Sequence, residues 1–127
     1  MMSWTPNGKE VLVRSFNVPT NYKFSTVRAT GGAGNRLPLE FASHVWFGPD
    51  TEHYAFTRFN RWGMAWFRYA GGMQNQIWVR RPKANPNDKE FVQVTNVPGT
   101  NEYPVWLGDR IYFVNENRGT STLQSVS

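Results

Sequence analysis

The sequence predicts an all-β protein, a partial β-propeller of about three antiparallel four-stranded blades, the first and last incomplete. Aromatic residues make up 16% of the chain and are accompanied by 11 Gly and 8 Pro. This composition favours short strands and tight turns over long helices. Short apolar runs recur between turn formers, and one turn signature repeats at the spacing of propeller blades.

The apolar runs are short and rich in β-branched and aromatic residues, as expected of strands. They occupy residues 11–13, 45–47, 54–56, 77–79, 91–94, 105–107 and 111–114. Since 127 residues is the length of one ordinary domain, we expect a single domain over residues 1–127.

Three turns share a signature and separate consecutive strands. Residues 5–8 read Thr-Pro-Asn-Gly, residues 48–51 read Gly-Pro-Asp-Thr and residues 108–110 read Gly-Asp-Arg. In such hairpin turns Pro presets one dihedral angle, and Asn, Asp or Gly accepts an unusual one. Aligning Pro6 with Pro49 gives a period of about 43 residues, which is typical of propeller blades. A β-sandwich with similar turns is the alternative fold.

The period divides the chain into blades at about residues 1–41, 42–95 and 96–127. The expected strands are 11–15, 22–29 and 36–41; then 44–47, 52–58, 76–80 and 90–95; then 104–107, 110–115 and 121–126. We expect a clipped inner strand before the first turn and a missing fourth strand in the third blade. An arc of this kind leaves uncovered faces and an unpaired edge. We therefore expect a homo-oligomer, with a dimer favoured: either a two-fold dimer that closes a six-bladed ring, or a domain-swapped or face-to-face assembly that covers the open edges.

Beyond the pattern, particular segments resemble a known family. The first two turns resemble the Trp-Ser-Pro-Asp-Gly repeats of TolB-type propellers. Residues 59–79, which include Trp66, Arg68, Tyr69 and Ile77-Trp78, are similar to a segment in the N-terminal propeller of tricorn-type proteases. Residues 104–113 look like that family's Pro-x-Trp-x-Gly-Asp-x-Ile-Tyr-Phe run, and the match is ordered from about residue 42 to 126. Ala70 departs from it, because the family segment usually carries an arginine there.

The resemblance implies a binding and assembly module that guides peptides, as the propellers of tricorn-type proteases are thought to do. We expect no second propeller, PDZ-like domain or serine protease core in this chain. The chain is expected to be either a short protein or a fragment of a longer protease.

The residues themselves carry no recognisable active site, so we expect no enzyme, no metal and no cofactor. There is no Cys, and the two histidines, His44 and His53, lie in strands where a structural role is the simpler interpretation. No Gly-x-Ser-x-Gly elbow is present, and the glycines at 31, 32 and 34 lack the Lys-Ser/Thr of a phosphate-binding loop.

The net charge of +5 and the pI of about 9.9 agree either with acidic partners or with ordinary solubility. The sequence contains no signal peptide and no apolar run of about 20 residues. We expect a cytoplasmic protein without a membrane partner.

A basic, aromatic loop is the candidate ligand site. Interleaved arginines and aromatics can hold anionic chain ends or stack on bases, although the aromatics could equally cover the blade beneath. Peptide carboxylates or acidic side chains are the expected ligands, and binding of nucleic acid or another polyanion is the alternative function. The candidate residues are Arg58, Arg61, Trp62, Trp66, Arg68, Tyr69, Arg80 and Arg81.

Overall fold

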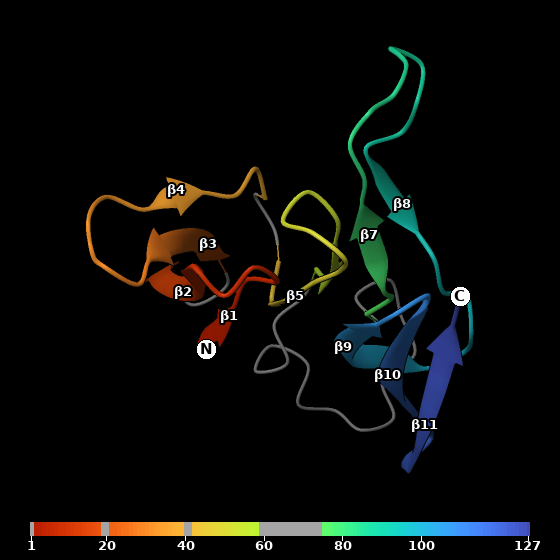
Figure 1. Cartoon of the computed structure of the whole chain (residues 1–127). Helices are drawn as coiled ribbons and strands as arrows, with labels where there is room; N and C mark the ends of the chain where they lie inside the picture. The colour runs from red at the N-terminus through yellow and green to blue at the C-terminus, as the bar shows by residue number, and fades with distance from the viewer. Residues whose placement is uncertain (1, 19–20, 40–41, 59–74) are drawn as a thin grey trace.

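The computed structural model describes residues 2–18, 21–39, 42–58 and 75–127. In this part of the chain every regular element is a β-strand, and the strands form three antiparallel sheets (Figure 1). The sheets follow one another along the chain, and each is built from strands that are consecutive in sequence. This arrangement confirms the all-β, partial-propeller prediction, and each sheet is called a blade below.

The first blade has the strand order β1-β2-β3-β4. Its turn between β1 and β2 is closed by hydrogen bonds from Thr5 N to Glu10 O at 3.0 Å and from Gly8 N to Thr5 O at 2.9 Å. Gly8 has a φ of 71°, a conformation that strongly favours glycine. The strands are β1 (Met2–Trp4), β2 (Glu10–Val18), β3 (Asn21–Arg28) and β4 (Asn35–Arg36).

The second blade has the order β5-β6-β7-β8. The turn between β5 and β6 is closed by Gly48 N, which donates to His53 O at 2.8 Å. The segment between β7 and β8 extends away from the body of the molecule (Figure 1). The strands are β5 (His44–Phe47), β6 (Tyr54–Thr57), β7 (Trp78–Arg80) and β8 (Phe91–Gln93).

The third blade has the order β11-β10-β9, so β11 is an edge strand in the described part of the chain. A two-residue turn joins Leu107 to Arg110, and Gly108 in this turn has a φ of 60°. The ladder between β9 and β10 shifts register between Tyr112 and Val114. The strands are β9 (Thr100–Leu107), β10 (Arg110–Asn117) and β11 (Thr120–Val126).

The core consists of two apolar layers, one at each junction between neighbouring blades. Leu12 and Phe24 of the first blade pack with Phe47, Tyr54 and other residues of the second. On the opposite side of the second blade, its core residues pack with the third blade; this layer contains Ala55, Ile77, Val79, Ile111 and Phe113. Because alternate residues of a strand point to opposite faces, the central blade is buried on both sides.

The structure corrects two strand predictions. The strand expected at 36–41 is wrong over residues 37–39, because β4 ends at Arg36 and Leu39 N donates to Leu37 O in a local turn; residues 40 and 41 lie outside the described part of the chain. Pro38 has no N–H with which to continue the ladder. The strand expected to begin at 104 begins at Thr100, so the inner strand of the third blade is longer than predicted. The blade boundaries near residues 41 and 95 stay predictions.

Candidate functional surfaces: two open faces and a tryptophan-lined recess

The first blade carries an apolar face that no strand of another blade covers in the described part of the chain. Trp4 pairs with Val11, and Val11 pairs with Val27, so the three side chains share one face. This face is opposite to Leu12, which is fully buried against the second blade. Trp4 is 62% exposed, whereas Phe47, which ends the inner strand of the second blade, is 6% exposed. The exposure of Trp4 therefore reflects the lack of a blade on that side in the described residues.

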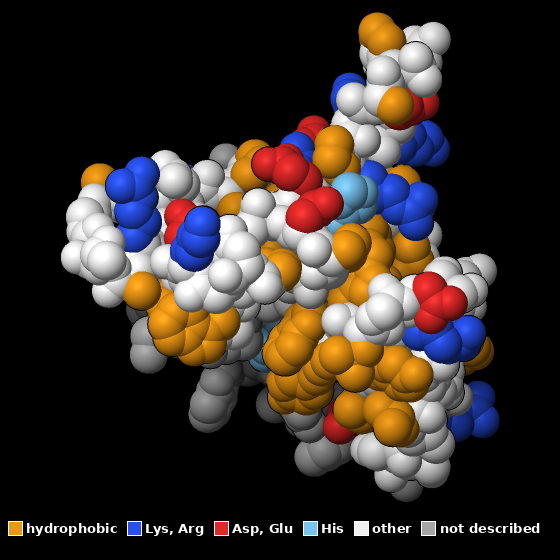
Figure 2. Space-filling model, in the orientation of Figure 1, with side chains coloured by type: hydrophobic (Ala, Val, Ile, Leu, Met, Phe, Trp, Pro, Cys, Tyr) orange, Lys and Arg blue, Asp and Glu red, His pale blue; other side chains and the backbone are white. Residues whose placement is uncertain are grey.

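The third blade carries the matching face at the other end of the arc. Tyr112 pairs with Val105, and Val114 pairs with Leu123, so these four side chains point away from the second blade. Leu123 is 75% exposed. Figure 2 shows hydrophobic side chains gathered over β9 and β10, and a separate group over β1. The open faces of the first and third blades are thus both apolar.

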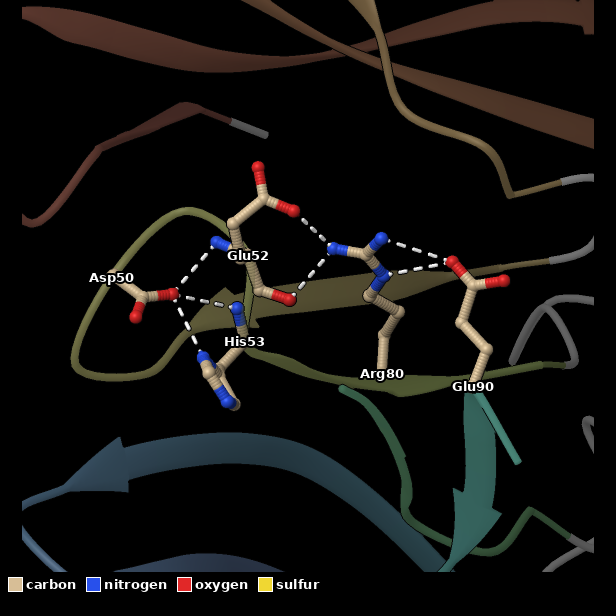
Figure 3. Close-up of polar contacts among 5 residues, drawn as sticks. All are labelled: Asp50, Glu52, His53, Arg80 and Glu90. Carbon is tan, nitrogen blue, oxygen red and sulfur yellow. Dashed lines mark hydrogen bonds and ion pairs between the residues drawn. The ribbon is translucent and has the colours of Figure 1, made fainter. Parts of the chain in front are cut away.

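A polar network surrounds the turn of the second blade (Figure 3). The guanidinium of Arg80 donates from Nε to Glu90 Oε1 at 3.0 Å, and from Nη1 to both the carbonyl and the carboxylate of Glu52. Burial acts to lower the pKa of Arg80, but the hydrogen bonds to the two carboxylates outweigh burial and raise it. Arg80 therefore ties the turn to β7 and β8, a role that sequence reasoning missed because its partners are distant in sequence.

The described members of the predicted ligand site lie at different ends of the second blade. The guanidinium of Arg58 lies 5.5 Å from the ring centre of Trp78, which pairs with Phe56 at one end of the β6–β7 ladder. Arg80 is at the other end of this ladder, and Arg81 follows it as an exposed residue. The other candidates lie outside the described residues: Arg61, Trp62, Trp66, Arg68 and Tyr69. The loop site stays a prediction.

The two histidines make contacts with neighbouring side chains. His44 Nδ1 lies 3.3 Å from Ser43 Oγ, and the His44 ring meets the ring of Tyr103 edge to face. His53 Nδ1 lies 2.8 Å from Asp50 Oδ1. Within the described residues, no three or more His, Asp or Glu side chains gather in a way that could hold a metal ion. That same part of the chain contains no helix with the length and apolar character needed to cross a membrane.

A recess of about 350 Å³ lies where the inner strands of the three blades end. Trp4 comes from β1, Trp46 from β5 and Trp106 from β9, so each blade contributes one tryptophan to its lining. A second recess of about 250 Å³ adjoins it at Pro6 and reaches Asp50 in the turn of the second blade. Sequence reasoning did not predict that these three tryptophans line one recess. The other lining residues of the larger recess are Ser3, Pro6, Phe47 and Gly48.

Comparison with known proteins agrees with this architecture. TolB from Acinetobacter baumannii has a similar structure, with a TM-score of 0.68 and 15% sequence identity; the alignment covers 98% of this chain and 28% of the TolB chain. At this identity the likeness shows the fold alone. The fold is that of a propeller protein.

The curated relatives are tricorn protease homologues. Tricorn protease homolog 1 of Streptomyces coelicolor is 34% identical over 126 residues, which cover 96% of this chain and 11% of that protein. The tricorn protease homolog of Saccharolobus solfataricus is 22% identical over 128 residues, and 11% of its length is covered. The chain thus spans about a tenth of the length of these relatives. The family model described as the tricorn protease N-terminal beta propeller domain matches residues 1–127, and the chain belongs to this family.

Proposed function

We propose that this propeller module is non-catalytic, self-associates through its two open blade faces, and guides peptides in the assembly that results. The observation that carries the proposal is the pair of uncovered apolar faces at the two ends of the arc. One contains Trp4, Val11 and Val27, and the other contains Tyr112 and Leu123.

The order of the faces supports a head-to-tail contact between two copies. Inside the chain, the face of the second blade that carries Phe47 packs against Leu12 of the preceding blade. The face of the third blade that carries Ile111 packs in the same way against Val79 of the second. The open face with Trp4 is of the same kind, so its natural counterpart is the open face of a third blade. A second copy supplies that face.

A ring of two copies uses this contact twice, which is favourable for stability. Full burial of one large apolar side chain contributes about 1.5–3 kcal/mol. Association itself costs about 4–15 kcal/mol, so several side chains must become buried together. Two contacts related by a two-fold axis share this single cost, and no open apolar face is left.

The mass in solution tests the assembly. We expect size-exclusion chromatography with light scattering to give twice the chain mass of 14.7 kDa over a range of protein and salt concentrations. Leu123→Glu places a charge on the open face of the third blade and is expected to shift the mass to that of one chain. Lys9→Glu, in the exposed turn of the first blade, is the control and is expected to leave the dimer intact. A folded monomer at every concentration would refute self-association.

Peptide guidance draws on the names of the two relatives, which are tricorn protease homologues. We expect fluorescein-labelled casein peptides to bind the assembled form with increased anisotropy, and to bind the Leu123→Glu monomer more weakly. Equal binding to both forms, or no binding, would contradict guidance by the assembly while leaving the mass measurement unaffected.

A further inference from the structure

The tryptophan-lined recess is a preformed cavity whose walls come from three blades. Trp4 and Trp46 are 62% and 38% exposed, so indole surface is accessible to solvent on two of its sides. Trp106 forms a third wall, and Phe47 and Pro6 complete the apolar lining. Since these three tryptophans belong to different blades, the recess depends on how the blades pack.

Trp106 is fixed in place by three contacts. Its indole lies so close over Gly48 that a Cβ there would come within 2.8 Å of the ring, so only glycine leaves room for it. Its Nε1–H donates to Gly108 O at 3.1 Å. His53 meets it edge to face, with 6.4 Å between the ring centres. A wall held in this way needs little reorganisation when a ligand binds.

A carboxylate lies beside the aromatic walls. Asp50 Oδ1 accepts hydrogen bonds from the backbone N–H groups of Glu52 and His53, at 2.8 and 3.0 Å, and contacts the His53 ring (Figure 3). The hydrogen bond with the His53 side chain is the largest cause of a lowered pKa at Asp50, and the backbone hydrogen bonds add to it. The side chain is 54% exposed and lines the smaller recess, so a negative charge faces solvent in the recess that adjoins the tryptophan-lined one at Pro6.

We propose that the recess binds an organic cation, an alkylammonium or guanidinium group, among the indoles of Trp4, Trp46 and Trp106, with Asp50 as the neighbouring anion. The face of an indole attracts a cation more strongly than the other aromatic rings do, and an anion would be repelled by both the rings and the carboxylate. The ligand needs only one copy of the chain, so this proposal does not depend on self-association. Trp4 also lies on the open face of the first blade, so binding is measured on the dimer and on the monomer.

Binding of choline and of its uncharged isostere, 3,3-dimethyl-1-butanol, tests the role of charge. The measurement is the shift of the tryptophan Nε1–H signals in ¹H–¹⁵N NMR spectra during titration. We expect choline to bind about 2–30-fold more tightly than the alcohol, which corresponds to about 0.5–2 kcal/mol of cation–π attraction. N-acetyl-lysine amide and N-acetyl-arginine amide are titrated in parallel, and tighter binding of either would identify a peptide side chain as the source of the cation.

Matched variants locate the site. Trp4→Ala and Asp50→Asn are expected to weaken choline binding, and Gly48→Ala is expected to weaken it by displacing Trp106. Leu123→Glu lies on the open face of the third blade, outside the recess, so the monomer that it produces should bind choline at least as tightly as the unchanged chain. Circular dichroism verifies that each variant is folded, and should Gly48→Ala not fold, the exposed Trp4 and Asp50 still decide the question. Equal affinity for choline and the alcohol, or shifts confined to the other three indoles, would overturn the proposal.

Discussion

At the scale of single residues, Tyr54 carries a buried hydroxyl that has no hydrogen-bond partner among the described residues. Burial raises the pKa of the Tyr54 hydroxyl from 10.0 to about 12. The positive charge of Arg80 lowers this pKa, and the negative charges of Glu90 and Glu52 raise it. The folded state thus holds this proton more tightly than the unfolded state. The stabilisation that comes from this tighter proton binding is complete below pH 10. As the pH rises toward 12 it is lost, and the free energy of unfolding falls by up to about 1.4 kcal/mol per pH unit. Tyr54→Phe should lessen this loss in urea unfolding at pH 7 to 11.

The same substitution should not lower stability at pH 7, because it removes a polar group that is buried without a partner. Thr26→Val in the first blade is a comparison, since it also exchanges a buried hydroxyl for an apolar group. If Tyr54→Phe lost more than about 1 kcal/mol at pH 7, the hydroxyl would have a partner that contributes to stability.

At the scale of elements, a ladder of buried amides joins the third blade to the second. Asn101 in β9 is fully buried; its Nδ2 donates to Gln76 Oε1 at 2.8 Å, and its Oδ1 accepts from Asn115 Nδ2 at 2.9 Å. Asn101→Ala removes both bonds, while Gln76 Oε1 keeps the hydrogen bond from Thr95 Oγ1 and Asn115 Nδ2 keeps its bond to Pro98 O. Each lost hydrogen bond costs about 0.5–1.5 kcal/mol. We expect the free energy of unfolding, measured with urea, to fall by about 1–3 kcal/mol. Asn117→Ala, at the exposed end of β10, should change it by less than about 0.5 kcal/mol.

At the scale of the whole molecule, the fold is an arc whose inner junctions are apolar and whose end faces are apolar as well. Assembly that buries the end faces adds stability only to the folded chain, so the midpoint of thermal unfolding should rise with protein concentration. Leu123→Glu is expected to remove this dependence. Calorimetry over a hundredfold range of concentration makes the measurement, and a midpoint that stays constant for the unmodified chain would contradict assembly through these faces.

The sequence by itself determined most of the strands, the repeated turns and the kind of fold. In β5 and β6 the residues on both faces are apolar, which indicates a blade covered on two sides, as residues 45–47 and 54–56 are. The repeated turns are local, since hydrogen bonds within residues 5–10 and 48–53 close them. Such turns can be predicted from sequence because their hydrogen bonds join residues that are only a few positions apart.

Only the tertiary structure decided which side chains from distant parts of the sequence contact one another. The strand expected at 36–41 ended early because a turn around Pro38 competes with the ladder. Arg80, predicted as a ligand residue, is bound by Glu52 and Glu90, which lie 28 and 10 residues away in sequence. The recess needs Trp4, Trp46 and Trp106 from three blades, and their distances follow from how the blades pack. Strand and turn preferences depend on residues that are close in sequence. A site built from several blades depends on how the blades pack, so no short sequence pattern predicts it.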